Sequence, residues 1–158
     1  MLEKVKFDGK HASTMFAKNL FLNNKKKKEQ VFLVVAAHDT TVDMKGLEKH
    51  LATGSGNLRA ADPAVMEQLI GVKQGSVNLF AILNDTAKKV KLIVDQRLTS
   101  HDFHFVGFHP MQNDATTAIT PADMMKVIEL SDHQPEIIDF SKLIAASAAP
   151  KDDATPKQ

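Results

Sequence analysis

Two apolar runs of strand length, separated by a short polar segment, constrain the fold of this chain more than any other feature. Residues 15–22 and 31–37 are predominantly apolar, and the segment between them contains Asn23, Asn24 and four consecutive lysines. Apolar runs of this length that are joined by a short polar loop are typical of a β-hairpin. The sequence therefore predicts an antiparallel strand pair in the first quarter of the chain.

Further strand and helix signals follow in an irregular order. Strand patterns cover residues 2–7, 79–83, 90–95, 103–108 and 135–140, and a short strand follows Thr116. Helices are predicted from their caps: Asp43 before residues 44–51, Asp62 with Pro63 before residues 64–70, and Thr120 with Pro121 before a helix that ends near Leu130. About seven strands and three or more helices without a strict βαβ rhythm predict a mixed sheet with helices on it, an α/β (α+β mixed) fold.

The length and composition of the chain limit its organisation. A chain of 158 residues is predicted to form one folded domain over residues 1–146, with a disordered tail or linker over the small and polar residues 147–158. The net charge of +1 gives no global attraction to nucleic acid, so any attraction has to be local. No apolar run is long enough to span a membrane and no signal peptide is recognisable, so we expect an intracellular, cytoplasmic protein.

Cysteine is absent, which excludes disulfides, thiolate metal sites and cysteine nucleophiles. The seven histidines show no metal-binding spacing, and the common nucleophile and nucleotide motifs are missing. We therefore predict neither a metal nor a cofactor.

Lys18 lies inside the first apolar run. A buried ammonium group costs several kcal/mol unless it is compensated. Lys18 is therefore either an edge-strand lysine that reaches the solvent or a cation that faces a polar pocket.

The lysine cluster beyond Lys18 has two interpretations. Lys25, Lys26, Lys27 and Lys28 form either a solvated turn or a turn that contacts phosphates, because crowded ammonium groups attract a polyanion.

Two later segments are candidates for ligand contact. Gly75 is followed by Ser76, Val77 and Asn78, and a glycine before small and polar residues lets backbone N–H groups approach a ligand. The same glycine is also explained as the end of a turn before a strand. His109 lies where a strand opens into a loop, a position that favours chemistry, although a single histidine is more often structural.

The segments AKNLFLNNKKKK, GSGNLRAAD, GSVNLF, VDQRL and FHPMQNDATTAITPADMMKVI, in this order, closely resemble the prolyl-tRNA editing family, also called the YbaK or prolyl-tRNA-synthetase-associated domain. The similarity covers roughly residues 9–140. The similarity implies a YbaK-like fold with a strongly curved sheet. Within the family, the chain is most similar to the branch that removes alanine from tRNA(Pro).

The resemblance also implies roles for individual residues. Lys18 matches the family's essential lysine, with Asn19 as its neighbour, and His109 matches a pocket histidine. Substrate-binding positions fall on Gly75, Ser76, Val77 and Asn78 and on Asn113 and Thr116. The lysine turn is expected to contact the acceptor stem. Two departures stand out: Leu79 replaces the proline of the family's glycine loop, and the leader helix and strand of the family are not found before Lys18, so we expect a fragment of a larger protein.

The resemblance implies trans-editing hydrolysis of mischarged aminoacyl-tRNA, alanyl-tRNA(Pro) above all. The partners are then the acceptor end of tRNA(Pro) and a prolyl-tRNA synthetase, in the same chain or separate. Hydrolysis of this activated ester needs positioning and oxyanion stabilisation but no covalent intermediate. Two alternatives remain at this point: a non-catalytic module that binds tRNA or a synthetase, and a deacylase for another small amino acid such as cysteine.

Overall fold

The computed structural model describes residues 13–109 and 116–148, and at its centre lies a seven-stranded sheet. The strands are β1 (Thr14–Asn24), β2 (Val31–Ala37), β3 (Leu58–Ala60), β4 (Val90–Asp95), β5 (Phe105–Phe108), β6 (Thr117–Ile119) and β7 (Glu136–Ile138). The α-helices are α1 (Met44–His50), α2 (Pro63–Ile70), α3 (Pro121–Leu130) and α4 (Phe140–Ala148), and the 3-10 helices are η1 (Leu79–Asn84) and η2 (Gln96–Thr99).

The predicted hairpin is confirmed and forms the middle of the sheet. β1 and β2 pair antiparallel from Ala17 opposite Ala37 to Asn23 opposite Val31. The strand order is β6-β5-β1-β2-β4-β7, and β3 also pairs with β1. Because β1–β5, β2–β4 and β4–β7 are parallel and the other pairs are antiparallel, the sheet is mixed, as the irregular order of elements predicts.

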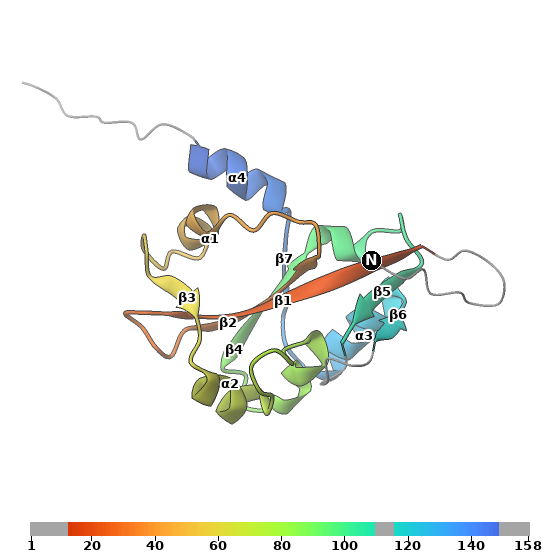
Figure 1. Ribbon diagram of the computed structural model, residues 1–158, viewed down its shortest axis with the longest axis horizontal. Coiled ribbons are helices and arrows are strands. Elements are labelled where there is room, and N and C mark those ends of the chain that lie inside the picture. The colour runs from red at the N-terminus through yellow and green to blue at the C-terminus, as the bar shows by residue number, and fades with distance from the viewer. Residues whose placement is uncertain (1–12, 110–115, 149–158) are drawn as a thin grey trace, which may run out of the picture.

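Two hydrophobic cores cover the two faces of the sheet, as the alternation of side chains along each strand requires. Phe21, Leu33 and Val35 belong to the core under α2, η1 and α3. Leu22 and Val34, which point the other way, belong to the core under α1 and α4. Figure 1 shows these two groups of helices on opposite sides of β1.

The three predicted helices begin where their caps place them. The side chains of Asp43, Asp62 and Thr120 accept hydrogen bonds from Lys45 N, Ala64 N and Asp123 N at 3.2, 2.8 and 3.0 Å. These bonds satisfy backbone donors that a helix leaves unpaired at its N-terminus. No helix in the two described ranges has the length and apolar character that a membrane span requires.

Two strand predictions need correction. Residues 79–83 form the 3-10 helix η1, because Asn78 caps it by accepting a hydrogen bond from Ala81 N at 3.2 Å. The predicted strand over residues 135–140 is confined to β7, and the chain then turns into α4, which the sequence analysis did not predict. Asp139 starts this helix by accepting hydrogen bonds from Ser141 N and Ser141 Oγ at 3.1 and 2.6 Å.

Some predicted segments fall outside the described residues. These are the strand over residues 2–7, the position Asn113, and residues 149–158 of the predicted tail. The tail was predicted to begin at Ser147, but Ser147 and Ala148 are the last residues of α4.

Candidate active site at an open edge of β1

The central strand β1 has a neighbouring strand on both sides over only part of its length. On one side β2 pairs with residues 17–23. On the other side β5 pairs with residues 14–16 and β3 with residues 22–24. Within the described residues, residues 17–21 therefore have no strand partner on the side away from β2. We call this stretch the open edge.

A cavity of about 230 Å³ lies beside the open edge. Its wall is formed by three segments of the chain: residues 19–22 of β1, the passage from β3 into α2, and the loop between α2 and η1. The lining residues include Asn19, Ala61, Met66, Gly75 and Val77. Ala61 closes one end of the edge, because its N–H donates to Phe21 O at 2.9 Å.

Asn19 contributes a polar wall to this otherwise largely apolar cavity. Its Oδ1 atom is buried and has no hydrogen-bond partner among the described residues. Leaving a buried acceptor unpaired costs about 1 to 3 kcal/mol, and unpaired groups in a native fold are concentrated at functional sites. Asn19 is thus a side chain that the fold alone does not explain.

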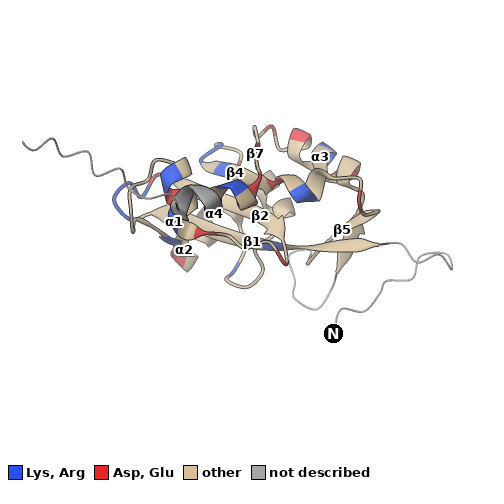
Figure 2. Cartoon of the chain, turned by 90° about the horizontal axis from the view of Figure 1, so that it is seen from above, with Lys and Arg blue, Asp and Glu red and all other residues tan. Residues whose placement is uncertain are grey.

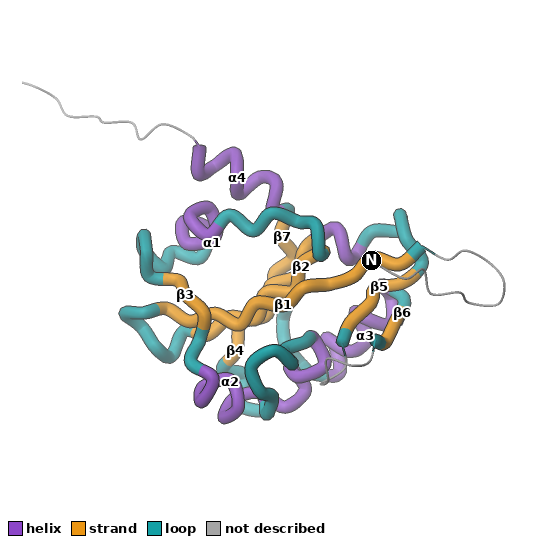
Figure 3. The backbone as a smooth tube through the Cα atoms, viewed as in Figure 1, coloured by secondary structure: helices purple, strands orange, loops and turns teal. Residues whose placement is uncertain are grey.

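The turn at Gly75 lines the same cavity as Asn19 and belongs to the loop between α2 and η1. Figure 3 shows the loop that follows α2 beneath β1. Gly75 has a φ of +89°, which a residue with a side chain rarely adopts. The turn is held from within: Ser76 N donates to Lys73 O at 3.0 Å, and Asn78 Nδ2 donates to Ser76 O at 2.9 Å. Asn78 is completely buried, so the turn is fixed to the core of the protein.

Lys18 is adjacent to Asn19 in sequence but does not line the cavity. Its partner in the sheet is Ala36, which belongs to the core under α1 and α4, so the side chain of Lys18 projects from the opposite face of the sheet to Asn19. There the Lys18 ammonium group donates to Thr40 O in the loop between β2 and α1. Lys18 is half-buried, and its amine has a defined hydrogen-bond acceptor. A lysine that only reaches into solvent would lack such an acceptor.

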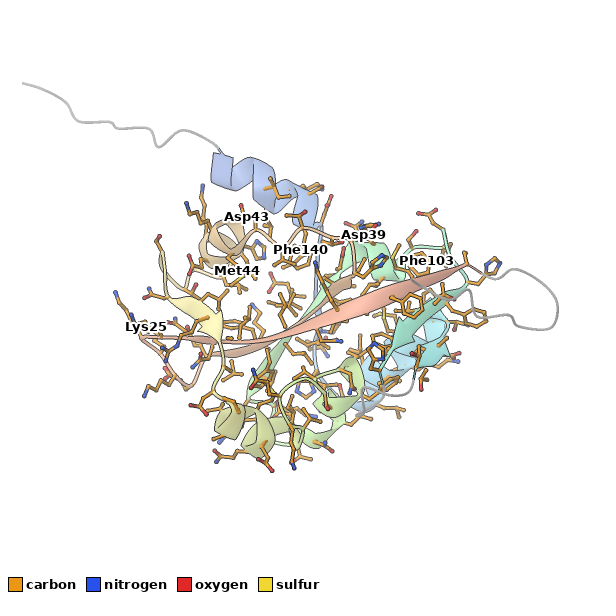
Figure 4. All side chains as sticks on the ribbon, viewed as in Figure 1. Lys25, Asp39, Asp43, Met44, Phe103 and Phe140 are labelled. Atoms are coloured by element: carbon orange, nitrogen blue, oxygen red, sulfur yellow. The ribbon has the colours of Figure 1, made fainter. Side chains whose placement is uncertain are left out.

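The loop that receives Lys18 is fixed by charged residues. Thr40 Oγ1 donates to Asp95 Oδ2 at 2.5 Å and accepts from the Arg97 guanidinium at 3.0 Å. Arg97 also forms two hydrogen bonds with Asp39, at 2.7 and 3.3 Å, and these bonds hold the pKa of Asp39 below its usual range. Figure 4 shows Asp39 on the same side of β1 as Phe140, the first residue of α4.

His109 and Thr116 lie at the ends of the β5–β6 hairpin. Phe108 pairs with Thr117, so the same register carried one residue further sets His109 opposite Thr116. β5 also runs parallel to β1, and Phe16 beside Gly107 is the last pair of this ladder, so the pairing ends two residues before both Lys18 and His109. Both His109 and Thr116 are exposed.

The structure therefore divides the predicted site residues between two neighbouring regions. Asn19, Gly75 and Val77 meet at the cavity, with Ser76 and Asn78 shaping the turn behind them. The Lys18 side chain lies on the other face of β1, and His109 and Thr116 follow the end of the β5–β6 ladder. Across the described ranges, no three histidine, aspartate or glutamate side chains lie close enough together to hold a metal ion.

The four-lysine turn lies at the β1–β2 end of the molecule, and Figure 2 shows it in blue at the left. All four lysines are exposed. The turn is ordered by Asn24, whose Oδ1 accepts from Lys26 N at 3.0 Å and whose Nδ2 donates to Gln30 Oε1 at 2.8 Å. Since β1 passes directly from the cavity wall at Leu22 to Lys25, the two features are about 10 Å apart along the strand.

Comparison with protein families supports the resemblance seen in the sequence. The family of the aminoacyl-tRNA editing domain matches residues 5–127, which is most of the chain and includes the open edge, the cavity and His109. The chain belongs to this family.

Relatives of this editing domain carry related names. The prolyl-tRNA synthetase associated domain-containing protein 1 of Danio rerio is 38% identical over 130 residues, which is 82% of this chain and 68% of that protein. The prolyl-tRNA editing protein ProX of Acetoanaerobium sticklandii is 31% identical over 112 residues, covering 71% of this chain and 65% of that protein. A putative proline–tRNA ligase of Schizosaccharomyces pombe is 30% identical over 159 residues, covering 99% of this chain but 22% of the ligase.

A solved structure from work on epitope backbone grafting by computational design has the same fold as the editing domain. The TM-score is 0.56 at 14% identity, and the match covers 79% of this chain and 70% of the other. At this identity the likeness concerns the fold alone.

Sequence reasoning missed the residues that hold Lys18 in this editing domain. Thr40 comes from the loop between β2 and α1, Asp95 from the end of β4 and Arg97 from η2, and none of them was a candidate site residue. A signal for Asp95 was present, because a carboxylate follows directly on the buried residues Leu92, Ile93 and Val94 and is itself 1% exposed. A buried carboxylate is rare without dedicated hydrogen-bond donors.

Proposed function

We propose that this editing domain hydrolyses the ester bond of mischarged aminoacyl-tRNA, with alanyl-tRNA(Pro) as its substrate. The observation that carries the proposal is the cavity at the open edge, which is lined both by Asn19 and by the Gly75 turn. Membership of the aminoacyl-tRNA editing family and the names of the relatives support the same reaction and point to proline tRNA.

The size of the cavity is compatible with a small aminoacyl group. A volume of about 230 Å³ is below the roughly 300 to 1,000 Å³ that is usual for ligand pockets. We propose that alanine enters and that the proline ring is excluded by steric clash. Steric exclusion discriminates more strongly than the loss of a methylene contact, which is worth about 1 to 3 kcal/mol.

The chemistry requires an attacking oxygen and a stabilised oxyanion. The chain has no cysteine, so we propose that a water molecule attacks the ester carbonyl and gives its proton to the ribose oxygen that leaves. The N–H of Ser76 already donates within the turn, so the neighbouring N–H groups of Gly75 and Val77 are the ones we assign to the carbonyl oxygen. The ester C–O bond then breaks, and the ribose oxygen leaves with a proton.

Asn19 and Lys18 divide the remaining tasks in this proposal. The side chain of Asn19, which lines the cavity, contacts the aminoacyl group of the substrate. The Lys18 ammonium group uses one of its three donors on Thr40 O, and its other donors bind the terminal phosphate or ribose, with His109 orienting a hydroxyl.

The test compares three charged tRNAs. The purified chain is incubated with alanyl-, cysteinyl- and prolyl-tRNA(Pro), and the remaining ester is followed over time. We expect fast loss of alanine and retention of proline. Fast loss of cysteine with slow loss of alanine would transfer the activity to another small amino acid.

Lys18→Ala should remove most of the deacylation and leave the fold intact, because one cation at the charged end of the substrate is lost while strand pairing is kept. Lys45→Ala, on the exposed surface of α1, serves as the matched control and should retain full activity. Undiminished deacylation by Lys18→Ala would show that this lysine has no role in the reaction.

One observation favours a second candidate function. Leu79 occupies the position of the family's loop proline, as it would in a domain that binds tRNA or a synthetase without catalysis. Filter retention of tRNA without loss of any of the three esters would favour this binding module.

A further inference from the structure

We infer that Thr40, fixed by Asp95 and Arg97, is the residue that positions the Lys18 amine for the reaction. This inference rests on the proposed function, because it assigns a support to the lysine that the proposed mechanism uses. It adds residues from the β2–α1 loop, from the end of β4 and from η2, and none of these lines the cavity.

The first observation is the hydrogen bonding of Thr40. Its carbonyl oxygen accepts from the Lys18 ammonium group, its hydroxyl donates to Asp95 Oδ2 at 2.5 Å, and the same hydroxyl accepts from Arg97 at 3.0 Å. Thr40 is 7% exposed, although His38, Asp39 and Thr41 around it are exposed. A single buried residue in an otherwise exposed loop therefore joins the amine to two charged side chains.

The second observation is the rigidity of Asp95. It lies at the end of β4, is 1% exposed, and accepts hydrogen bonds from Ala37 N at 3.1 Å and from Arg97 N at 3.0 Å in addition to the Thr40 hydroxyl. A carboxylate held by backbone donors of two elements has little freedom to move. Asp95, which is fixed to the sheet, thus holds Thr40 in place, and Thr40 in turn holds the Lys18 amine.

The third observation is the geometry of β1. A lysine side chain has four rotatable bonds and no intrinsic preference for one direction. Its backbone is fixed by pairing with Ala36, so the acceptor at Thr40 selects where the ammonium group lies. Misplacement of a reacting group by about 1 Å can lower a rate by about 100-fold, so such a support has a measurable effect.

The decisive variant is Thr40→Val, which keeps the shape of the side chain and removes the hydroxyl. We expect kcat/KM for alanyl-tRNA(Pro) to fall by about 10- to 100-fold. Thr40→Ser keeps the hydroxyl and should stay within about threefold of the wild-type protein. Thr41→Val, the exposed neighbour in the same loop, is the matched control and should behave as the wild-type protein does.

A purely structural role of Thr40 is separated by the double variant. If Thr40 acts through Lys18, Thr40→Val has no further effect in the Lys18→Ala background, whereas a general loss of structure would reduce the residual activity again. If Lys18→Ala lost activity but Thr40→Val kept the wild-type rate, the inference would be wrong and the proposed function would still hold.

A measurement without tRNA separates failure of the inference from failure of the proposed function. The amine reactivity of each lysine towards an acylating reagent is mapped by peptide mass spectrometry. Lys18 should react more slowly than the lysines of the four-lysine turn in the wild-type protein, and this protection should be lost in Thr40→Val. Fast reaction of Lys18 in the wild-type protein would overturn the inference, even if Thr40→Val did not fold. An inactive wild-type protein would overturn the proposed function, and the reactivity of Lys18 would then decide the inference alone.

Discussion

Replacing Asn19 by leucine should raise the stability of the protein and abolish deacylation. The reason is the buried Oδ1 atom, which has no hydrogen-bond partner in the part of the chain that the structure describes. An unpaired buried acceptor costs about 1 to 3 kcal/mol, and leucine has a similar volume without that cost. For a chain of this size, 1 kcal/mol corresponds to about 2 to 4 °C in Tm, so we expect Asn19→Leu to raise Tm by about 2 to 10 °C.

The same strand offers a matched control. Asn23 is four residues further along β1, is 5% exposed, and also has an Oδ1 atom without a partner among the described residues. It does not line the cavity. Asn23→Leu should therefore raise the stability in the same way and leave deacylation unchanged. The difference between the two variants isolates the function of Asn19 from the removal of a buried amide.

Two assays are needed, because the prediction has two parts. Thermal unfolding gives the change in Tm, and ester loss from alanyl-tRNA(Pro) gives the change in activity. If Asn19→Leu lowered Tm while Asn23→Leu raised it, Asn19 would be a structural residue with a hydrogen-bond partner. Full activity of the stabilised variant would refute its role at the substrate.

Three further predictions concern other parts of the molecule. Replacing all four lysines of the turn by glutamine should weaken tRNA binding and reduce the slope of log K against log salt by up to about 3, and an unchanged slope would exclude phosphate contacts there. Asp85 is buried, and burial alone would raise its pKa, but hydrogen bonds from His133 and from Val90 N and Lys89 N outweigh it and lower the pKa. The stabilisation from Asp85 is therefore present above the unfolded-state pKa of about 4, and it is lost as the pH falls through the folded-state pKa. In urea unfolding, the free energy of unfolding of Asp85→Asn should therefore fall less at acid pH than that of the wild-type protein. An equal fall in both proteins would contradict the pairing of Asp85 with His133. Gly46→Ala should lower the free energy of unfolding by about 1 to 3 kcal/mol, because the added Cβ would lie 3.1 Å from Leu143 Cβ and closer still to the Leu143 backbone. A gain in stability would show that α4 does not pack tightly on α1.

The fold was predictable where local signals agree with the tertiary structure. The β1–β2 hairpin follows from two apolar runs and a polar turn, and α1, α2 and α3 follow from their caps, which the structure confirms. Residues 79–83 misled the prediction, because a short apolar run suits a strand and a buried helical turn equally well. The difference is made by Asn78, whose side chain caps η1, and a cap is recognised only when the following residues are known to be helical.

The site was predictable only in part, because its geometry depends on which face of a strand each residue occupies. The resemblance singled out Lys18 and Asn19 as a pair, and alternation along β1 sends them to opposite faces. The acceptor of Lys18 is a backbone carbonyl in a loop, and the sequence carries no side-chain signal for such a contact. The open edge is likewise a property of pairing between β1, β3 and β5, which are far apart in the chain.

The resemblance to the family predicts a proline where this chain has Leu79, and the turn before Leu79 is nevertheless fixed in place. Proline at this position would restrict its own φ and favour an extended residue before it. In this protein Asn78 is already extended, with φ −153° and ψ 170°, and its side chain bonds Ser76 O on one side and Ala81 N on the other. Leu79 is fully buried at the first position of η1, so its side chain holds the turn against the core. The rigidity that a ring supplies covalently is here supplied by two hydrogen bonds and apolar packing, and the turn can therefore present the same backbone to a substrate.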